Sequence, residues 1–331
     1  MFDKKNLILL TGAGGFIGGH LVADLLRQGY ERIRAVDVKP MPEWFQLFPQ
    51  AENLQRDLKD KAACYEVTEG ADFVFNLAAN MGGMGFIETH KAECMLSVLI
   101  NTHMLMAARD CGVQRFLYTS SACAYPGEKQ TTTDAVPLVE SDVYPAMPED
   151  GYGWEKLFSE RMCRHFNEDF GLATRIARNH NCYGPYGTYD GGREKAPAAI
   201  CRKVIQAKLA GQDKIEIWGN GEQTRSFMYI DDCVKGLELI MKSDFSEPLN
   251  LGSDQMVTIN HLVDIVETIA GVKLRRRYNL DAPKGVRGRN SDNTLIKSVL
   301  GWAPSISLED GIEMNYHWIY DQMSTARRSH G

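Results

Sequence analysis

The chain has 331 residues, of which 44% are hydrophobic and 24% are charged, and this balance is typical of a globular protein with one large domain or two smaller ones. Its formal net charge is -6, whereas a general nucleic-acid-binding surface normally carries a basic excess. We therefore expect no nucleic-acid partner, and an anionic substrate would have to be bound by a few local cations.

The first apolar run and the cysteines indicate the cellular compartment of the protein. Residues 7–10 are apolar, but this run is too short for the hydrophobic part of a signal peptide or for a membrane span. The eight cysteines are scattered and never form a C-x-x-C pair, which favours reduced thiols over disulfides or a zinc site. We expect a cytoplasmic protein without a membrane anchor or a metal.

The first half of the chain alternates short apolar strands with amphipathic helices. Strands are predicted at 6–11, 32–37, 72–76, 114–119 and 173–178, with a further strand directly before Asp57. Helices are predicted near 16–28, 62–67, 90–111 and 152–170. Strands separated by helices indicate βαβ units, so we expect an α/β fold of the Rossmann type with a doubly wound parallel sheet.

After Arg178 the pattern changes. Residues 179–193 are rich in Gly, Asn and Tyr and are expected to form a functional loop. Helices are predicted at 196–210 and 231–242, a strand at 214–218, and mixed helix and loop from Val257 on. We expect a Rossmann domain of residues 1–178 with a return segment at about 227–250, and a smaller substrate-binding domain of residues 179–226 and 251–325.

A glycine-rich turn joins the first predicted strand to the first predicted helix. Gly12 permits the tight turn, Gly15 lets the backbone approach a pyrophosphate, and Gly18 lets the helix pack closely on the strand. The start of the helix, at Phe16 and Ile17, offers free N–H groups and the positive end of its dipole to the phosphates. A glycine motif alone is weak evidence, but its position between strand and helix makes it a specific signal for a dinucleotide.

Asp37 ends the second predicted strand and bears on the choice of cofactor. A carboxylate here accepts hydrogen bonds from the adenosine ribose hydroxyls and repels a 2′-phosphate, which favours NAD over NADP. Lys39 lies close by and weakens this preference slightly, and the alternative is that Asp37 only ends a strand. Asp57 and Leu58 are expected to frame the adenine, and Ala78 to line the middle of the cofactor.

Tyr152 and Lys156 open a predicted helix and form the candidate chemical centre. Residues four apart share a helix face, so the two side chains project together. An ammonium beside a phenol favours the phenolate, and we expect the pKa of Tyr152 to be lowered. Ser121 ends the fifth predicted strand and can place a hydroxyl beside that phenol.

These motifs resemble the extended short-chain dehydrogenase/reductases. The glycine turn at 12–18, Ser121 and the Tyr152/Lys156 pair match that family, and so does the segment 221–227, so the resemblance covers nearly the whole chain. It implies a Rossmann domain with a small C-terminal nucleotide-sugar-binding domain. It also implies that Tyr152 is the redox base, that Lys156 contacts the nicotinamide ribose, and that Ser121 hydrogen-bonds the sugar hydroxyl.

Four less common segments, at 81–86, 120–126, 184–197 and 286–293, resemble the GDP-mannose 3,5-epimerases. This resemblance implies conversion of GDP-D-mannose to GDP-L-galactose and GDP-L-gulose through a transient 4-keto intermediate and enolate, with reversible hydride transfer to bound NAD. The chemistry is consistent, because a proton leaves an unactivated sugar carbon prohibitively slowly, whereas a ketone at C4 makes both C3 and C5 acidic.

Epimerisation at C3 and C5 also requires an acid and a base on opposite faces of the sugar ring. The resemblance assigns these roles to Cys123 and Lys195. The residues alone leave the roles open: a free cysteine is usually a small buried hydrophobe. A lysine at a helix start is usually solvated, although cations are disfavoured there.

The diphosphate of the substrate requires cations, and a guanidinium can bind a phosphate with two parallel hydrogen bonds. Arg225, Arg287 and Lys203 are the best candidates, although any one of them could be a solvated surface residue. The glycines of segment 81–86 either bring backbone N–H groups to the sugar or form a tight loop. The predicted substrate-binding residues are Gly82, Gly83, Ser121, Asn181, Lys195, Lys203, Arg225 and Arg287.

Rival functions stay open. A 4,6-dehydratase requires a carboxylic acid pair after the fifth strand, where this chain has Ala122 and Cys123. A 4-epimerase requires only the tyrosine and gives no reason for Lys195. A non-catalytic dinucleotide-binding protein would have no need of Tyr152 and Lys156. The resemblance further implies a homodimer through the helices near 90–111 and 152–170.

Overall fold

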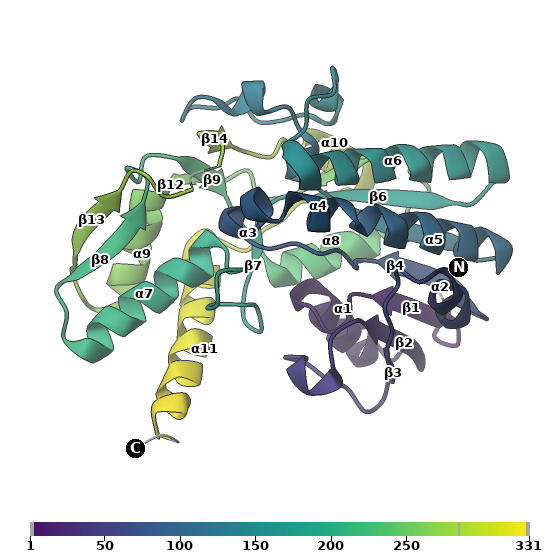
Figure 1. Ribbon diagram of the computed structural model, residues 1–331, viewed down its shortest axis with the longest axis horizontal. Coiled ribbons are helices and arrows are strands. Elements are labelled where there is room, and N and C mark those ends of the chain that lie inside the picture. Colours follow the sequence, from purple (N-terminus) through teal and green to yellow (C-terminus); the bar gives the residue numbers. More distant parts are fainter. Residues whose placement is uncertain (1–2, 284, 329–331) are drawn as a thin grey trace.

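The computed structural model describes residues 3–283 and 285–328. Its centre is a parallel seven-stranded sheet with the strand order β11-β6-β5-β4-β1-β2-β3 (Figure 1). The strands are β1 (Leu7–Thr11), β2 (Arg32–Asp37), β3 (Glu52–Gln55), β4 (Phe73–Asn76), β5 (Arg115–Ser121), β6 (Thr174–Asn179) and β11 (Leu249–Leu251). The strand order reverses between β1 and β4, which is where doubly wound sheets bind their ligands. The expected Rossmann-type α/β fold is confirmed.

Helices cover both faces of this sheet. α1 (Phe16–Arg27) and α8 (Ile230–Lys242) pack on one face, and α2 (Lys61–Thr68), α5 (Ser97–Asp110) and α6 (Asp150–Phe170) pack on the other. Successive residues of a strand point to opposite faces, so Ile8 and Leu10 of β1 join the first layer while Leu7 and Leu9 join the second. Burial on both faces explains why the strand is apolar throughout.

Smaller sheets and further helices lie to the left of the large sheet in Figure 1. β7 (Cys182–Tyr183) pairs with β10 (Met228–Tyr229), β8 (Lys214–Trp218) with β13 (Arg275–Asn279), and β9 (Thr224–Ser226) lies between β12 (Met256–Thr258) and β14 (Gly288–Arg289). The helices here are α7 (Ala196–Ala210), α9 (Ile259–Ala270) and α11 (Leu308–Arg328). Helix α10 (Thr294–Leu300) instead lies near the top of Figure 1 and contacts β11 of the large sheet. Single 3-10 turns are η1 (Met41–Glu43), η2 (Ala122–Ala124), η3 (Gly127–Gln130) and η4 (Glu140–Val143).

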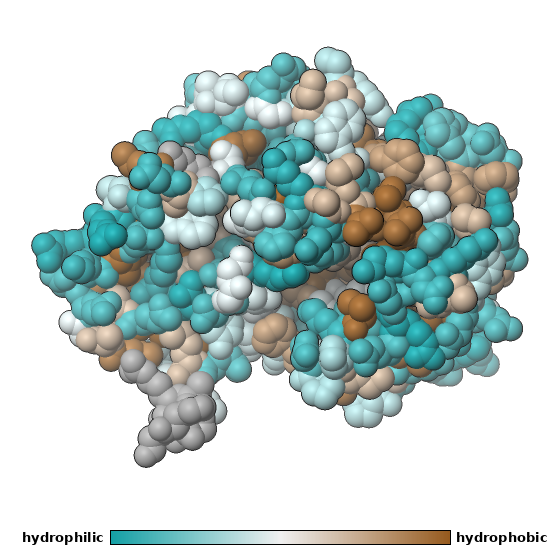
Figure 2. Space-filling view, in the orientation of Figure 1, coloured by the Kyte–Doolittle hydropathy of each residue, from teal (hydrophilic) through white to brown (hydrophobic). Residues whose placement is uncertain are grey.

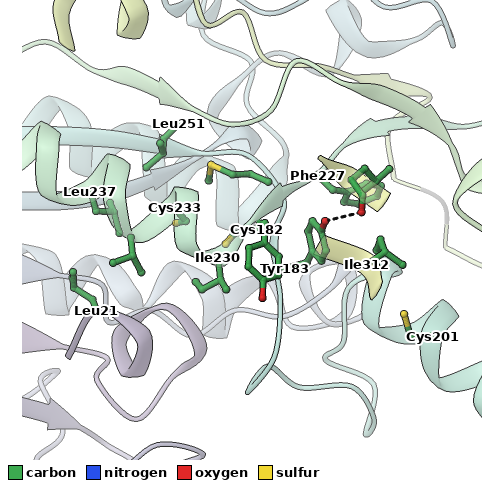
Figure 3. Packing of buried hydrophobic residues seen from close by; sticks show 14 of the residues in the cluster. Leu21, Cys182, Tyr183, Cys201, Phe227, Ile230, Cys233, Leu237, Leu251 and Ile312 are labelled. Carbon is green, nitrogen blue, oxygen red and sulfur yellow. Dashed lines mark hydrogen bonds between the residues drawn. The ribbon is translucent and has the colours of Figure 1, made fainter. Parts of the chain in front are cut away.

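One hydrophobic core joins the two halves of the chain. It runs from Leu21 on α1 through Ile230 and Leu237 on α8 to Ile312 on α11 (Figure 3). Strand β11 and helix α8 lie in the layers of the large sheet, although they follow the smaller elements in sequence. The boundaries given above for two domains stay a prediction.

Two expectations about secondary structure were wrong. The helix predicted at 90–111 is divided into α4 (Lys91–Met95) and α5, and α3 (Met84–Thr89) precedes them. The division falls at Leu96, beside the point where Ser97 turns inward and accepts a 3.0 Å hydrogen bond from the Asn80 amide. The second error concerns the tail after Val257, which was expected to contain only helix and loop. It also contains strands: residues 275–279 pair in parallel with β8 despite their polar sequence.

All eight cysteines are free thiols. Within the described residues, no helix is both long enough and apolar enough to cross a membrane.

A buried ion pair fastens α6 to the sheet. The Arg178 guanidinium on β6 donates to both carboxylate oxygens of Glu160 on α6, at 2.8 and 2.7 Å. Ser120 Oγ at the end of β5 donates to the same carboxylate at 2.5 Å, and Arg178 also donates to the Glu140 carbonyl at 2.7 Å. A buried ion pair is tolerated when further hydrogen bonds satisfy both partners, as they do here.

Removing one partner of this pair should destabilise the fold strongly. Glu160→Ala leaves the Arg178 charge buried and uncompensated, and we expect the free energy of unfolding to fall by about 3–5 kcal/mol. Glu168→Ala on the same helix is the matched control, because its partner Arg164 is exposed, and it should change little. Urea unfolding at one protein concentration compares the two variants, and equal stabilities would contradict this reading of the pair.

Candidate active site

A cleft of about 810 Å³ runs along the carboxyl edge of the large sheet. All the residues predicted to bind the cofactor line it: Gly12, Gly15, Phe16, Ile17, Gly18, Asp37, Asp57, Leu58, Ala78, Tyr152 and Lys156. Ser121, Gly82 and Lys195 line it as well. The structure therefore brings the nucleotide-binding turn and the candidate chemical centre, which lie far apart in the sequence, into one continuous space.

The glycine turn has the geometry that its sequence predicts. Gly12 has a φ of +71°, and a Cβ there would stand 3.0 Å from the Ala78 amide nitrogen. A Cβ on Gly18 would collide with the Gly12 carbonyl, so only glycine allows α1 to start this close to β1. Helix α1 begins without a side-chain cap and without an acidic residue in its first turn. Its first residues line the cleft, and this arrangement fits a pyrophosphate.

Asp37 lies at the end of β2, with its side chain largely buried. Its Oδ1 accepts a 3.0 Å hydrogen bond from the Lys39 amide, which fixes the direction of the carboxylate. The Lys39 ammonium donates to the Gly14 carbonyl at 3.4 Å, so this side chain is held on the glycine turn. A fixed carboxylate beside the cleft suits the two ribose hydroxyls of an adenosine without a 2′-phosphate.

Tyr152 and Lys156 project together from the first turns of α6, as predicted. Lys156 Nζ lies 5.4 Å from the centre of the Tyr152 ring and donates to the Thr119 carbonyl at 3.1 Å. The expected lowering of the Tyr152 pKa was wrong. Burial raises this pKa well above its usual value and the electrostatic interactions with Cys123 and Glu155 add to the rise, whereas a hydrogen bond to Ser121 lowers it. The Lys156 ammonium also lies 3.6 Å from Glu155 Oε2.

A polar network under the helix holds Glu155 in place. Asn101 Nδ2 donates to Glu155 Oε1, and Ser159 Oγ donates to the same oxygen at 3.1 Å. Asn76 at the end of β4 donates to Asn101 Oδ1 at 2.8 Å. The network connects β4, α5 and α6, and so it fixes the carboxylate that faces Lys156. Sequence analysis missed it because nothing in the sequence shows that residues 76, 101 and 155 meet.

Cys123 does not line the cleft but lies directly beside it. It sits on η2, two residues after Ser121, and packs in a small buried cluster with Tyr152, Phe86, Ile87 and Cys94. Its sulfur lies 3.7 Å from Arg289 Nη1. Cys123 is therefore close to the candidate redox residue, as the spacing to Ser121 suggested, and a cation faces its thiol.

The predicted phosphate-binding cations lie outside the cleft lining. Arg225 on β9 donates to the Thr224 carbonyl at 2.7 Å and to the Val286 carbonyl at 2.5 Å, and burial lowers its pKa to about 10. Arg287 donates to Asn220 Oδ1 at 2.9 Å. Lys203 donates to the Glu216 carbonyl at 2.9 Å, and burial lowers its pKa.

Arg289 is a site residue that sequence analysis missed. It belongs to the segment 286–293, but only Arg287 of that segment was selected. In the structure Arg289 pairs in register with Arg225 across β14 and β9, and its side chain is buried. Alternation along a strand would place residues 287 and 289 on the same side, but only the pairing with β9 shows that Arg289 reaches Cys123.

Lys195 is the residue before α7 and lines the cleft. The segment 81–86, which includes the first residues of α3, packs against the segment that carries Lys195. Gly83 N–H donates to the Arg193 carbonyl at 3.0 Å, and the Arg193 guanidinium lies 3.8 Å above the centre of the Phe86 ring. The Gly83 amide is thus bonded within the protein, and a Cβ on Gly83 would collide with the Glu194 carbonyl.

Two asparagines lie at the end of β6: Asn179 is its last residue, and Asn181 follows it. Asn181 donates from Nδ2 to the Ser226 carbonyl at 3.0 Å and does not line the cleft. Asn179 does line it, and its Oδ1 is buried without a hydrogen-bond partner among the described residues. The sequence pointed to the right loop, but it did not show which asparagine reaches the cleft.

Comparison with known proteins agrees with this geometry. Residues 8–252 match the NAD dependent epimerase/dehydratase family. The chain belongs to this family. Members with similar sequences include GDP-mannose 3,5-epimerase from Arabidopsis thaliana, 48% identical over 97% of this chain and 84% of that protein. GDP-mannose 3,5-epimerase 1 from Oryza sativa subsp. japonica is 48% identical over 97% and 83%. Among solved structures, UDP-glucose 4-epimerase from Thermotoga maritima has a TM-score of 0.85 at 25% identity, covering 96% of this chain and 99% of that one.

Family membership makes NAD the cofactor, and the contact of Asp37 with it can be tested. In Asp37→Ala we expect NAD to bind roughly 10- to 100-fold more weakly, because hydrogen bonds to a charged acceptor are lost. The preference for NAD over NADP should narrow, since the carboxylate no longer repels a 2′-phosphate. Titration calorimetry of both dinucleotides measures this, with Glu31→Ala, at an exposed position directly before β2, as the control. Unchanged NAD affinity would show that Asp37 does not contact the ribose.

Proposed function

We propose that this chain is a GDP-mannose 3,5-epimerase, which converts GDP-D-mannose to GDP-L-galactose and GDP-L-gulose. The observation that carries this proposal is the likeness to plant enzymes of that name over nearly the whole chain. The arrangement of Tyr152, Cys123 and Lys195 around one cleft supports it. The eight free thiols are consistent with a cytoplasmic location, which is part of the proposal.

The first task of the site is to make the sugar acidic. When bound, NAD would supply reversible hydride transfer at C4. In this proposal Tyr152 Oη accepts the proton of the C4 hydroxyl, Ser121 orients that hydroxyl, and Lys156 contacts the nicotinamide ribose. Burial raises the pKa of Tyr152, and Lys156 is the neighbouring cation proposed to favour its deprotonation.

The second task is proton transfer at C3 and C5, which become acidic once C4 is a ketone. Cys123 and Lys195 are proposed as the acid and base. They come from separate elements, the turn after β5 and the residue before α7, which suits transfer on two faces of one ring. Lys203, Arg225 and Arg287 are proposed to bind the nucleotide diphosphate. Asn181 is proposed as a further substrate-binding residue, with Gly82 and Gly83 near the sugar. A 4-epimerase is the second candidate because of the similar fold, but it gives Cys123 and Lys195 no role.

Incubation of the purified protein with GDP-mannose in heavy water tests the proposal. Each inverted carbon takes its new hydrogen from an enzyme group that has exchanged with solvent, so C3 and C5 should gain deuterium. C4 should not, because its own hydrogen is returned. NMR of the products reads all three positions. Inversion at C4 alone would support a 4-epimerase instead, and an unchanged substrate would refute the proposal.

Variants should separate the two steps. Tyr152→Phe should reduce turnover roughly 10²- to 10⁴-fold, which is the usual contribution of a general acid–base group. Cys123→Ser should still allow C4 oxidation but should greatly slow exchange at C3 and C5, because a hydroxyl is a far weaker acid than a thiol. Lys195→Ala should also block inversion but leave some exchange through Cys123. Full inversion by Cys123→Ser would contradict the assignment of that residue.

A homodimer through α4, α5 and α6 is a further part of the proposal. Large apolar side chains on these helices are exposed, and they gather over this part of the surface in Figure 2. They are Met95, Leu96, Leu99, Trp154 and Phe158. Exposed apolar patches on a globular protein mark interaction surfaces, and a second copy presents the same patch in a two-fold arrangement.

A charge on this surface should disrupt the dimer. Phe158→Glu places a carboxylate in the patch, and we expect the molecular mass from light scattering to fall from that of two chains to that of one. Tyr278→Glu, an exposed aromatic on β13 away from the patch, is the control and should leave the mass unchanged. A wild-type mass of one chain would refute the dimer.

A further inference from the structure

A buried cluster beside the cleft holds one guanidinium on three sides. Arg289 Nε donates to Gln130 Oε1 at 2.5 Å, Arg289 Nη2 forms an ion pair with Glu149, and Arg289 Nη1 lies 3.7 Å from Cys123 Sγ. The Arg289 and Glu149 side chains are 5% and 14% exposed, so water does not screen their charges strongly. The contacts with Gln130 and Glu149 fix the direction in which the guanidinium faces Cys123 Sγ.

Glu149 touches Cys123 by a second route. It is the residue before α6, and its amide donates to the Cys123 carbonyl at 2.9 Å. Gly153 N–H donates to the Glu149 carbonyl at 2.7 Å, and a Cβ on Gly153 would collide with the Cys123 carbonyl. The start of the helix that carries Tyr152 is therefore packed directly on the turn that carries Cys123.

Titratable side chains from several elements face Cys123. Tyr152 on α6, Arg225 on β9 and Arg289 on β14 lie around it. A cation beside a cysteine favours the thiolate. The Arg225 guanidinium donates to two backbone carbonyls. Of these two cations, Arg289 is the one with a nitrogen, Nη1, in contact with the sulfur.

We propose that Glu149 is a positioning residue that acts through Arg289 on Cys123. Its carboxylate holds the guanidinium against the sulfur, so that Cys123 can release a proton to the sugar carbon as a thiol and take one up as a thiolate. This inference rests on the proposed function, in which Cys123 exchanges a proton with C3 or C5. The alternative is an ion pair that only stabilises the fold.

Alkylation of Cys123 tests the link without any turnover. Iodoacetamide reacts with thiolates, and mass spectrometry of the Cys123 peptide distinguishes this thiol from the other seven. In Glu149→Ala the guanidinium is no longer directed, and we expect alkylation of Cys123 at pH 7 to slow by roughly tenfold. Glu149→Gln keeps an acceptor oxygen for Arg289 and should restore the rate to within about threefold of wild type.

Asp150→Ala is the matched control, because Asp150 is the next residue, also begins α6, and pairs with exposed Lys91 instead. Its Cys123 should react at the wild-type rate. Equal rates in Glu149→Ala and wild type would overturn the proposal. If Glu149→Ala does not fold, Glu149→Gln provides the test. A Glu149→Gln variant with a wild-type melting temperature but alkylation more than tenfold slower would also overturn the proposal. The slower reaction would then come from removing the carboxylate charge, and not from losing the oxygen that holds Arg289.

An experiment with substrate then distinguishes a positioning role of Glu149 from a purely structural one. In heavy water with GDP-mannose, Glu149→Ala should lose deuterium uptake at C3 and C5 by roughly tenfold while NAD reduction, read by absorbance, stays near wild type. An equal loss of both would point to a structural role. If wild type itself leaves GDP-mannose unchanged, the proposed function fails, whereas the alkylation series still reports on the contact between Arg289 and Cys123.

Discussion

The ion pair between Arg178 and Glu160 joins the sheet to α6 in a region that water does not reach. Through Ser120 it includes the end of β5 as well, so the strand that carries Ser121 and the helix that carries Tyr152 are held at one fixed spacing. Two charges in such a place are costly to desolvate, and they are stable only because every surrounding donor and acceptor is directed at them. The chemical centre therefore depends on a polar core beneath it, in addition to apolar packing.

A second buried ion pair with further polar contacts lies beside Cys123. There Arg289 is shared between Glu149, Gln130 and the thiol, and the backbone of Glu149 returns to the turn of Cys123. Helix α6 thus contributes Tyr152 and Lys156 by side chain and supports Cys123 from its first turn. A single helix therefore sets the positions of Tyr152, Lys156 and the turn of Cys123 relative to one another.

Local patterns predicted most of the large sheet. The five strands assigned bounds from apolar runs lie within two residues of those bounds, because each contains apolar side chains that enter the core. The glycine turn, Asp37 and the Tyr152/Lys156 pair were equally local, and all of them line the cleft. The polar strands β13 and β14 were missed, since their pairing with β8 and β9 depends on partners about 60 residues away. For the same reason Arg289, Glu149 and Asn179 were not selected: each acquires its position from tertiary contacts.

The shared core described for α1, α8 and α11 has a consequence for shortened chains. Leu21 and Ile312 belong to one continuous cluster of buried apolar side chains, so α11 completes an apolar layer that begins on α1. A fragment ending near residue 250 would expose the apolar faces that α9 and α11 now cover. We therefore expect the loss of these last helices to destabilise the part of the core that both halves of the chain share. At the rim of the cleft, the hydrogen bond from the Gly83 amide to the Arg193 carbonyl joins two further segments from different halves of the chain.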